Sequence, residues 1–286
     1  MMTDAKQFAA QVTKTIGAVP AAAPKRRLLI DMKGIRKSYY VGRPNELEIL
    51  HGIDLKVWEG EFVAIVGESG SGKSTLMNII GVLDKPTAGA YTLDGIDIHN
   101  ADDNELAAIR NRKIGFVFQT YNLIGRQSAL KNVELPMLYA GVSGGERSRR
   151  AAEWLRRVGM GDRMKHQPNE LSGGQKQRVW IAMALAQDTK VLFLDEPTTY
   201  LDIRYQLQIL KLIRQLNREF GITIIMVLHD INQSLYYSDE IVAMKDGQMI
   251  AHGLPEEILT SELVQEVYDV NLDIRSVGGK PFVIPV

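Results

Sequence analysis

The chain has 286 residues, of which 45% are hydrophobic and 24% charged, with a formal net charge of +0 and no cysteine. This composition is typical of a globular protein with a sizeable core. It excludes disulfides, thiolate metal sites and cysteine catalysis, and the neutral balance offers no bulk attraction to nucleic acid or anionic lipid. No run approaches the ~20 apolar residues of a membrane span, so we expect no nucleic-acid partner and no direct membrane insertion.

The first part of the chain divides into an extension and a strand region. Residues 1–27 are rich in alanine, contain proline and lack a continuous apolar stretch like that of a secretory signal. We interpret them as a flexible N-terminal extension. From Leu28 to Val57, apolar and polar residues alternate on either side of a loop at Gly42-Arg43-Pro44, which predicts antiparallel strands.

The next segments indicate buried strands, a helix and a turn. The apolar run Glu61–Val66 leads into a glycine-rich segment and a helix that begins near Lys73. Tyr91–Ile98 predicts a hairpin that turns at Asp94-Gly95, and Ile114–Phe118 predicts a further strand.

Residues 121–173 differ from their surroundings. Within them, Arg147–Val158 is strongly charged but has apolar residues at helical spacing, so we predict a helical subdomain inserted into a sheet domain. The later elements expected in chain order are a helix at Gln175–Gln187, a strand at Val191–Leu194, a helix at 203–219, a strand at Ile222–Leu228, a hairpin at Asp246-Gly247 and a helical segment at about 255–268. Buried strands that alternate with helices predict an α/β fold with a mostly parallel sheet.

The strongest motif is Gly67-Glu68-Ser69-Gly70-Ser71-Gly72-Lys73-Ser74-Thr75, which fits G-x-x-x-x-G-K-[ST] between a strand and a helix. Glycines let backbone N–H groups close around phosphates, and the helix N-terminus adds a favourable partial charge. Lys73 would reach the β- and γ-phosphates and Ser74 would ligate Mg²⁺. The alternative is a glycine- and serine-rich turn that binds nothing.

Two carboxylates follow the predicted strand Val191–Leu194. They emerge at its C-terminal end, where α/β proteins bind their ligands. Asp195 would hold Mg²⁺, and Glu196 would polarise the attacking water as a general base. Such a pair alone is more often ordinary strand-end surface, so its value comes from following a phosphate loop.

A third motif, Leu171-Ser172-Gly173-Gly174-Gln175, precedes a helix. The two glycines permit close approach of an anion to the backbone, although a serine N-cap explains the same pattern. With the first two motifs, this segment resembles the signature of the ATP-binding cassette (ABC) ATPases, over about residues 28–270. The resemblance implies a P-loop NTPase (RecA-like) core with an antiparallel β subdomain, a nucleotide-binding domain at 28–270 and a C-terminal tail at 271–286.

The resemblance also implies residue roles. Tyr39 would stack on adenine, with a half-buried sheet tyrosine as the alternative; Gln119 would be the lid glutamine and His229 the switch histidine at the γ-phosphate. The loop ending at Asp202 would cross a dimer interface, and it has Thr199-Tyr200-Leu201 where the family usually has Ser-Ala-Leu. The predicted set is Glu196, His229 and Gln119 for catalysis, Ser74, Gln119 and Asp195 for Mg²⁺, and Tyr39, Gly67, Ser69, Gly70, Gly72, Lys73, Ser74, Thr75, Ser172, Gly173, Gly174, Gln175 and Asp202 for ATP.

In this family the signature of one chain caps the ATP held by the other. We therefore expect a homodimer with two competent sites that powers a membrane permease from the cytoplasmic face, where the chain is peripheral. A soluble ABC ATPase of translation or DNA repair is an alternative, but it would need two cassettes or a long coiled coil, and the sequence has neither. An artificial or orphan cassette without a permease is a further alternative.

The two halves resemble different subfamilies. Residues 28–179 resemble lipoprotein-release and macrolide-export ATPases, and residues 180–286 resemble iron–siderophore importer ATPases. The first likeness rests on Gly67–Asn78, Ile114–Gln119 with Tyr121-Asn122-Leu123, and Asn132–Pro136; the second rests on Trp180–Gln187, Leu194–Asp202 and Val227–Gln233. Either a divergent member mixes features or the chain is a chimera joined near residues 175–180. Because permeases of this family dock beside the lid glutamine and the helical subdomain, we expect partner choice to follow residues 119–173.

Overall fold

The computed structural model describes residues 26–119, 123–199, 201–277 and 280–284. Most of the expected N-terminal extension therefore lies outside the described residues, as do Tyr121, Asn122 and Tyr200. Among the described residues, none of the helices combines the length and the apolar character that crossing a membrane requires.

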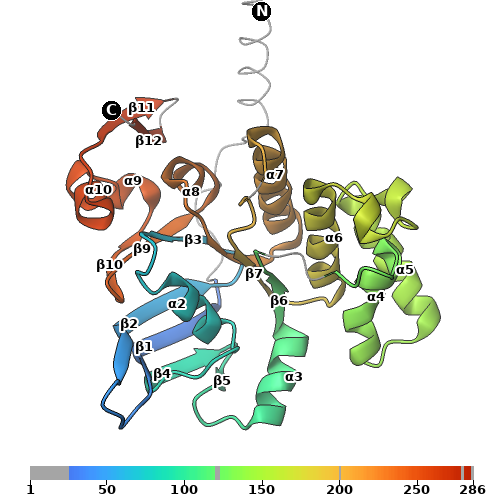
Figure 1. The fold of residues 1–286 in the computed structure, drawn as a ribbon, viewed down its shortest axis with the longest axis horizontal. Helices are drawn as coiled ribbons and strands as arrows, with labels where there is room; N and C mark the ends of the chain where they lie inside the picture. The colour runs from blue at the N-terminus through green and yellow to red at the C-terminus, as the bar shows by residue number, and fades with distance from the viewer. Residues whose placement is uncertain (1–25, 120–122, 200, 278–279, 285–286) are drawn as a thin grey trace, which may run out of the picture.

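An antiparallel sheet forms one part of the fold (Figure 1). In the described residues its strand order is β2-β1-β4-β5, with β1 at Leu28–Tyr39, β2 at Leu47–Trp58, β4 at Ala88–Leu93 and β5 at Ile96–Asp97. The predicted antiparallel strands are confirmed, and β4 and β5 join at the predicted Asp94-Gly95 turn.

A six-stranded sheet forms the centre of the described residues, in the order β10-β9-β3-β8-β7-β6. Its strands are β3 (Phe62–Gly67), β6 (Ile114–Val117), β7 (Val191–Asp195), β8 (Thr223–Val227), β9 (Glu240–Lys245) and β10 (Gln248–Gly253). All neighbouring pairs are parallel except β9 and β10, which form the predicted hairpin at Asp246-Gly247. The carboxyl ends of β3, β6, β7 and β8 therefore share one edge of the sheet.

Both faces of this sheet are covered, as strand β8 illustrates. Successive side chains point to opposite faces: Ile225 and Val227 pack in a core with the antiparallel sheet, whereas Ile224 and Met226 pack in a second core. Helix α2 (Lys73–Ile80) belongs to the first core, between the two sheets. Helices α6 (Gly173–Ala186) and α7 (Ile203–Phe220) cover the second face.

The predicted helical subdomain contains α4 (Ala129–Tyr139) and α5 (Gly144–Arg157), followed by short 3₁₀ turns at Gly161–Arg163 and Pro168–Glu170. Together with α6 it lies to one side of the central sheet, away from the antiparallel sheet (Figure 1). The Nε1 atom of Trp180 on α6 donates a hydrogen bond of 2.6 Å to the carbonyl of Phe116 on β6. This contact fixes α6, on which α4 and α5 pack, to the central sheet.

Helix α3 (Asp103–Lys113) was not predicted from the sequence. Its start has a capping box in which Asp102 accepts from the amide of Glu105, and Glu105 accepts from the amide of Asp102. The Asp-x-x-Glu pattern was the available signal, but the helix has few apolar residues and so lacks a clear periodic stripe.

The C-terminal part packs on the other side of β3 and β9. It comprises α8 (Ile231–Tyr237), α9 (Pro255–Ile258), α10 (Ser261–Tyr268) and an antiparallel pair, β11 (Asp273–Val277) and β12 (Lys280–Ile284). The helical segment expected at 255–268 is interrupted, because Leu259 is extended and Thr260 caps α10. The tail expected at 271–286 contains this strand pair, and Asn232 of α8 exchanges two hydrogen bonds of 2.9 and 2.8 Å with the backbone of Val283.

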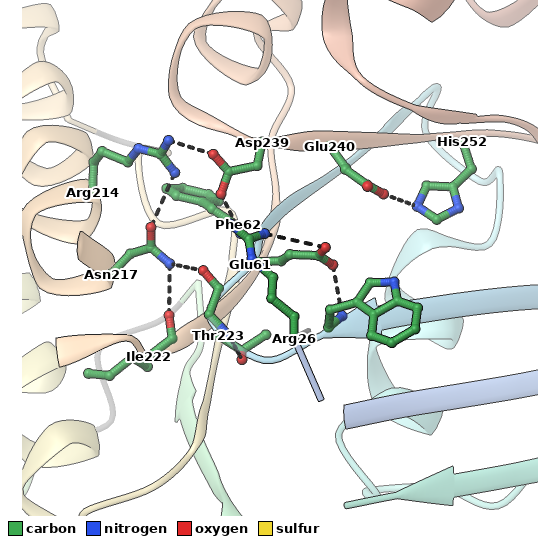
Figure 2. Close-up of polar contacts among 12 residues, drawn as sticks. Arg26, Glu61, Phe62, Arg214, Asn217, Ile222, Thr223, Asp239, Glu240 and His252 are labelled. Carbon is green, nitrogen blue, oxygen red and sulfur yellow. Dashed lines mark hydrogen bonds and ion pairs between the residues drawn. The ribbon is translucent and has the colours of Figure 1, made fainter. Parts of the chain in front are cut away.

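The amino end of β3 is fixed by a polar network (Figure 2). The carboxylate of Asp239 accepts from the amide of Phe62 at 3.0 Å and pairs with Arg214 of α7 at 2.5 Å. Asn217, one turn further along α7, donates to the carbonyls of Ile222 and Gly60 at 2.8 and 2.9 Å. Helix α7 thus holds the strand that leads into the glycine-rich loop.

A buried carboxylate joins the antiparallel sheet to the central sheet. Asp94 is 9% exposed and pairs with Arg27, Lys113 and Lys190 at 2.5, 2.6 and 3.3 Å. Burial acts against its charge, but hydrogen bonds and charge attraction from Lys113 and Lys190 outweigh it and hold the pKa of Asp94 below its ordinary value of 3.8. Because Lys113 and Lys190 immediately precede β6 and β7, this pairing sets the two sheets against each other.

We expect Asp94→Asn to lower the free energy of unfolding at pH 7 by on the order of 2 kcal/mol, because it leaves three cations facing a neutral group. A carboxyl whose folded pKa is depressed contributes stability above its unfolded pKa and loses it as the pH falls through the folded pKa. The difference between the two proteins should therefore shrink as the pH falls below about 4. Urea unfolding of both proteins at pH 7 and below about pH 4 measures this difference, with the exposed Asp273→Asn as control. A difference in the free energy of unfolding that grows on acidification contradicts the prediction.

Candidate nucleotide-binding site

The predicted phosphate loop runs from the end of β3 into α2, as the motif requires. Gly67 has φ 145°, and a Cβ there would lie 2.2 Å from the carbonyl oxygen of Met244, so only glycine fits. Gly72 has φ 95° and caps α2 in a left-handed conformation. Ser69, Gly70 and Ser74 are exposed, which leaves this loop and the helix N-terminus open to an anion.

Lys73 folds back over this loop. Its Nζ atom donates to the carbonyls of Gly67 and Glu68 at 2.9 and 2.5 Å, and the residue is only 6% exposed. Burial lowers the pKa of Lys73, although the nearby charges of Glu196 and Asp195 act in the opposite direction. The ammonium is therefore poorly solvated and lies close to two carboxylates, a setting in which a phosphate would be a favourable partner.

The loop is also supported by the hairpin between β9 and β10, which sequence reasoning placed but did not connect to the site. The amide of Gly247 donates to the carbonyl of Ser71 at 3.1 Å, and the amide of His51 on β2 donates to the carbonyl of Gly247 at 2.9 Å. The hairpin turn thus bridges the phosphate loop and the antiparallel sheet.

The three predicted catalytic residues meet at one carboxylate. Glu196 accepts from Gln119 Nε2 at 2.8 Å and pairs with His229 Nε2 at 2.6 Å. Thr199, which sequence reasoning did not assign a role of its own, donates to the same carboxylate at 3.2 Å. Glu196 has φ 48°, a left-handed conformation that is uncommon for a residue other than glycine. Its partners come from the ends of β6 and β8 and from the loop after β7.

Asp195 has the properties of a cation ligand. Its Oδ1 atom is buried and has no hydrogen-bond partner among the described residues. Burial and the adjacent charge of Glu196 raise the pKa of Asp195, and the charges of His229 and Lys73 offset this only in part. The ionised form therefore lacks full compensation among the described residues. A divalent cation would supply it. The hydroxyl of Ser74 and the amide oxygen of Gln119 are the other donors of the predicted set, and both are oxygen ligands of the kind that Mg²⁺ prefers.

The signature segment leads into α6, whereas the phosphate loop leads into α2, and the two helices lie in different parts of the fold (Figure 1). Ser172 caps α6, and its side chain and that of Gln175 bind each other's backbone amides at 3.4 and 2.9 Å. The N-cap interpretation is therefore realised, while Ser172 stays exposed. Gly173 and Gly174 form the first residues of α6. Asp202 caps α7 by accepting from the amide of Tyr205 at 3.0 Å, and the ring of Tyr205 packs against Gly174.

Tyr39 lies at the end of β1 and is 37% exposed. Its hydroxyl is 3.4 Å from Asp84, and Lys37 Nζ lies 5.1 Å from the ring centroid. These contacts leave both predicted interpretations open, an adenine platform and a half-buried sheet residue. Thr75, in the first turn of α2, is half-buried.

The arrangement supports proton transfer to Glu196. A carboxylate has about four lone-pair sites, and the contacts with Gln119, Thr199 and His229 occupy three of them. One site remains for a water that could be deprotonated. The phosphate loop, the desolvated ammonium of Lys73 and the unpartnered oxygen of Asp195 lie at the same edge of the sheet, so fold and site together define a P-loop ATPase.

Comparison with known proteins places this ATPase in a family. The model of the family described as "ABC transporter" matches residues 50–199. The uncharacterized ABC transporter ATP-binding protein YknY of Bacillus subtilis is 50% identical over 222 residues, which cover 78% of this chain and 95% of that protein. The macrolide export ATP-binding/permease protein MacB of Nitrosomonas europaea is 46% identical over 228 residues, but these are 80% of this chain and only 34% of that protein.

Solved structures agree. The ATP-binding cassette MJ0796, in a dimeric post-hydrolysis state with ADP and Pi, matches with a TM-score of 0.72 and 43% identity, covering 79% of this chain and 99% of that chain. The structure of cbiO1 from Clostridium perfringens matches with a TM-score of 0.75 and 31% identity, over 84% and 94% of the two chains. The chain belongs to the ABC transporter family; it binds ATP with Mg²⁺ and hydrolyses it.

We expect Lys73→Met to separate stability from nucleotide binding. A lysine whose folded pKa is lowered destabilises the fold while it is charged, so the melting temperature of the nucleotide-free variant should not fall. The rise that saturating Mg-ATP causes in the parent protein, roughly 5–10 °C at a hundredfold excess over Kd, should disappear. Thermal melts with and without Mg-ATP test this, with the exposed Lys165→Met as control; a variant that keeps the rise contradicts the assignment.

Proposed function

We propose that this chain is the ATP-hydrolysing subunit of a membrane transporter and works as a dimer of two copies that enclose two nucleotides. The observation that carries the proposal is the carboxylate of Glu196, held by Gln119, Thr199 and His229 beside the phosphate loop in a chain of the ABC transporter family. The chain would act at the cytoplasmic face of a membrane, attached through its permease.

In this proposal each chain supplies most of a site. The phosphate loop, with Lys73, would bind the phosphates, and Tyr39 the adenine. Ser74, Gln119 and Asp195 would hold Mg²⁺, whose charge would stabilise the phosphate oxygens. Glu196 would accept the proton of the attacking water. His229 would orient Glu196 and contact the γ-phosphate.

The second copy would complete the site with Ser172–Gln175 and Asp202. One feature supports this arrangement: Ser172 is exposed although its segment is rich in backbone donors. The related cassette MJ0796 has been solved as a dimer.

Glu196→Gln is the decisive variant. The amide keeps the shape of the carboxylate but cannot accept a proton, so we expect ATP hydrolysis to fall by about 10²–10⁴-fold while binding persists. The dimer should then accumulate, because its bound ATP is not hydrolysed. Size-exclusion chromatography in Mg-ATP detects this dimer. A variant that stays monomeric with saturating Mg-ATP argues against the sandwich dimer, and one that hydrolyses ATP at the parent rate argues against Glu196 as base.

A groove between the core and the helical subdomain supports the proposed permease contact. Its volume is about 350 Å³. Its lining residues come from α3, β6, α4 and α6: Ala107, Arg110, Asn111, Ile114, Phe116, Phe118, Pro136, Trp180, Met183, Ala184 and Gln187. The rings of Phe116 and Phe118 stack at 5.2 Å and Trp180 meets Phe118 edge-on at 6.4 Å, so the floor is aromatic. Such a surface suits an apolar helix of a partner.

The groove refines the expectation that partner choice follows residues 119–173. Pro136 lies in that range, but Phe118 precedes it and Trp180 and Met183 follow it. Residues of both the exporter-like and the importer-like stretches therefore line the groove. The match to YknY spans 222 residues and therefore extends across residue 180.

We expect the chain to co-purify from membranes with an exporter-type permease in preference to a siderophore permease. Met183→Glu should weaken that association at least tenfold, because it places a charge beside the aromatic rings of the groove, and should leave the ATPase activity of the isolated chain unchanged. Phe282→Glu, on an exposed apolar residue outside the groove, is the control. Preference for the siderophore permease contradicts the proposal, and failure to associate with any membrane favours an orphan cassette.

A further inference from the structure

A second polar cluster lies directly beside Glu196. A cavity of about 170 Å³ opens there. It is lined by Glu196, Thr198, Thr199, Gln206, His229, Asp230 and Gln233. Glu196, Thr199 and His229 belong to the site already described, and Asp230 caps α8. Gln206 on α7 and Gln233 on α8 have no role in it so far.

The two glutamine amides form a directed chain of hydrogen bonds. Gln206 Nε2 donates to the carbonyl of Leu201 at 2.9 Å. Because a carbonyl can only accept, this bond fixes the orientation of the Gln206 amide and leaves its Oε1 free to accept. Gln233 Nε2 donates to that Oε1, again at 2.9 Å. The orientation of the second amide is therefore fixed by the first.

This chain of hydrogen bonds joins two segments whose positions we expect to depend on the bound nucleotide. Leu201 belongs to the loop that would cross the dimer interface, between Thr199 and Asp202. Gln233 lies four residues after His229, in helix α8. The N-cap of this helix, Asp230, accepts a hydrogen bond of 3.0 Å from the backbone amide of Gln233. Thr199 and His229 both contact the carboxylate of Glu196.

We propose that Gln206 and Gln233 are a positioning pair that couples the interface loop to the switch-histidine segment, so that closure of the dimer sets the geometry of Glu196. Neither residue contacts the reacting atoms; each acts through the segment it holds. The Oε1 atom of Gln233 is buried and has no hydrogen-bond partner among the described residues. It can therefore accept a hydrogen bond from a donor that approaches when the dimer closes.

The pair is expected to affect turnover more than nucleotide affinity. The phosphate loop and Lys73 lie outside the amide chain, so the binding of ATP to one chain should not depend on it. Hydrolysis should, because misplacement of the groups around Glu196 removes transition-state interactions. Cooperativity in ATP should also fall, since the link carries closure to the site.

Gln206→Met, Gln233→Met and the double variant test the inference in the full-length chain, with Gln215→Met on the exposed side of α7 as the matched control. We expect kcat at saturating Mg-ATP to fall about 3- to 10-fold in each single variant, as loss of one neutral hydrogen bond allows. The double variant should lose no more than the worse single variant. In these variants KM and the Kd for a fluorescent ATP analogue should stay within twofold of the parent values, and the Hill coefficient for ATP should drop toward 1. The control Gln215→Met should keep its kcat within twofold of the parent.

Gln206→Glu supplies a variant that stays polar. Its carboxylate still accepts from Gln233 but cannot donate to Leu201, so kcat should fall by the same factor with unchanged Kd. The inference is overturned if kcat stays within twofold of the parent, if the single losses multiply in the double variant, or if Kd rises as much as kcat falls. It rests on the proposed hydrolytic role of Glu196, and an inactive parent protein would defeat that role alone.

Discussion

Glu196 depends on three donors that come from different strand ends, and the proposed hydrolysis depends on Glu196. A left-handed backbone at a residue other than glycine is costly and persists only where the surroundings determine it. Gln119, Thr199 and His229 provide those surroundings, at 2.6–3.2 Å. The parallel sheet makes this meeting possible, because it brings the carboxyl ends of β6, β7 and β8 to one edge.

Two groups near this carboxylate, Lys73 and Asp195, are each unfavourably buried in their charged form. Among the described residues, the largely buried ammonium of Lys73 donates to two backbone carbonyls and one hydroxyl, while Asp195 has a buried oxygen without a partner. Burial lowers the pKa of the first and raises that of the second. A bound anion and a bound cation would relieve both, so the site is arranged for a charged ligand at the expense of the free chain's stability.

The fold also separates what one chain does from what two chains do. The phosphate loop and Glu196 meet within a chain, whereas Ser172 and Gln175 satisfy each other at the start of α6 and Asp202 satisfies the start of α7. These caps keep the signature segment preorganised while its outer surface stays exposed. The Gln206–Gln233 chain then lies where a change at that surface could reach Glu196.

The sequence by itself predicted most strands and helices, the phosphate loop and the carboxylate pair, because each rests on local periodicity or on a motif of fixed spacing. The resemblance to the ABC ATPases added Gln119 and His229, but Thr199, helix α8 and the β11–β12 pair were not predicted. The sequence also did not predict α3, whose weak apolar stripe hides a capping box, or the break at Leu259 in the last helical segment. Only the tertiary structure decided the contacts between distant segments: Gly247 with the phosphate loop, Asn232 with Val283, and Gln206 with Gln233. A side chain's partner across such distances follows from helix packing and strand order, and no local pattern encodes that choice.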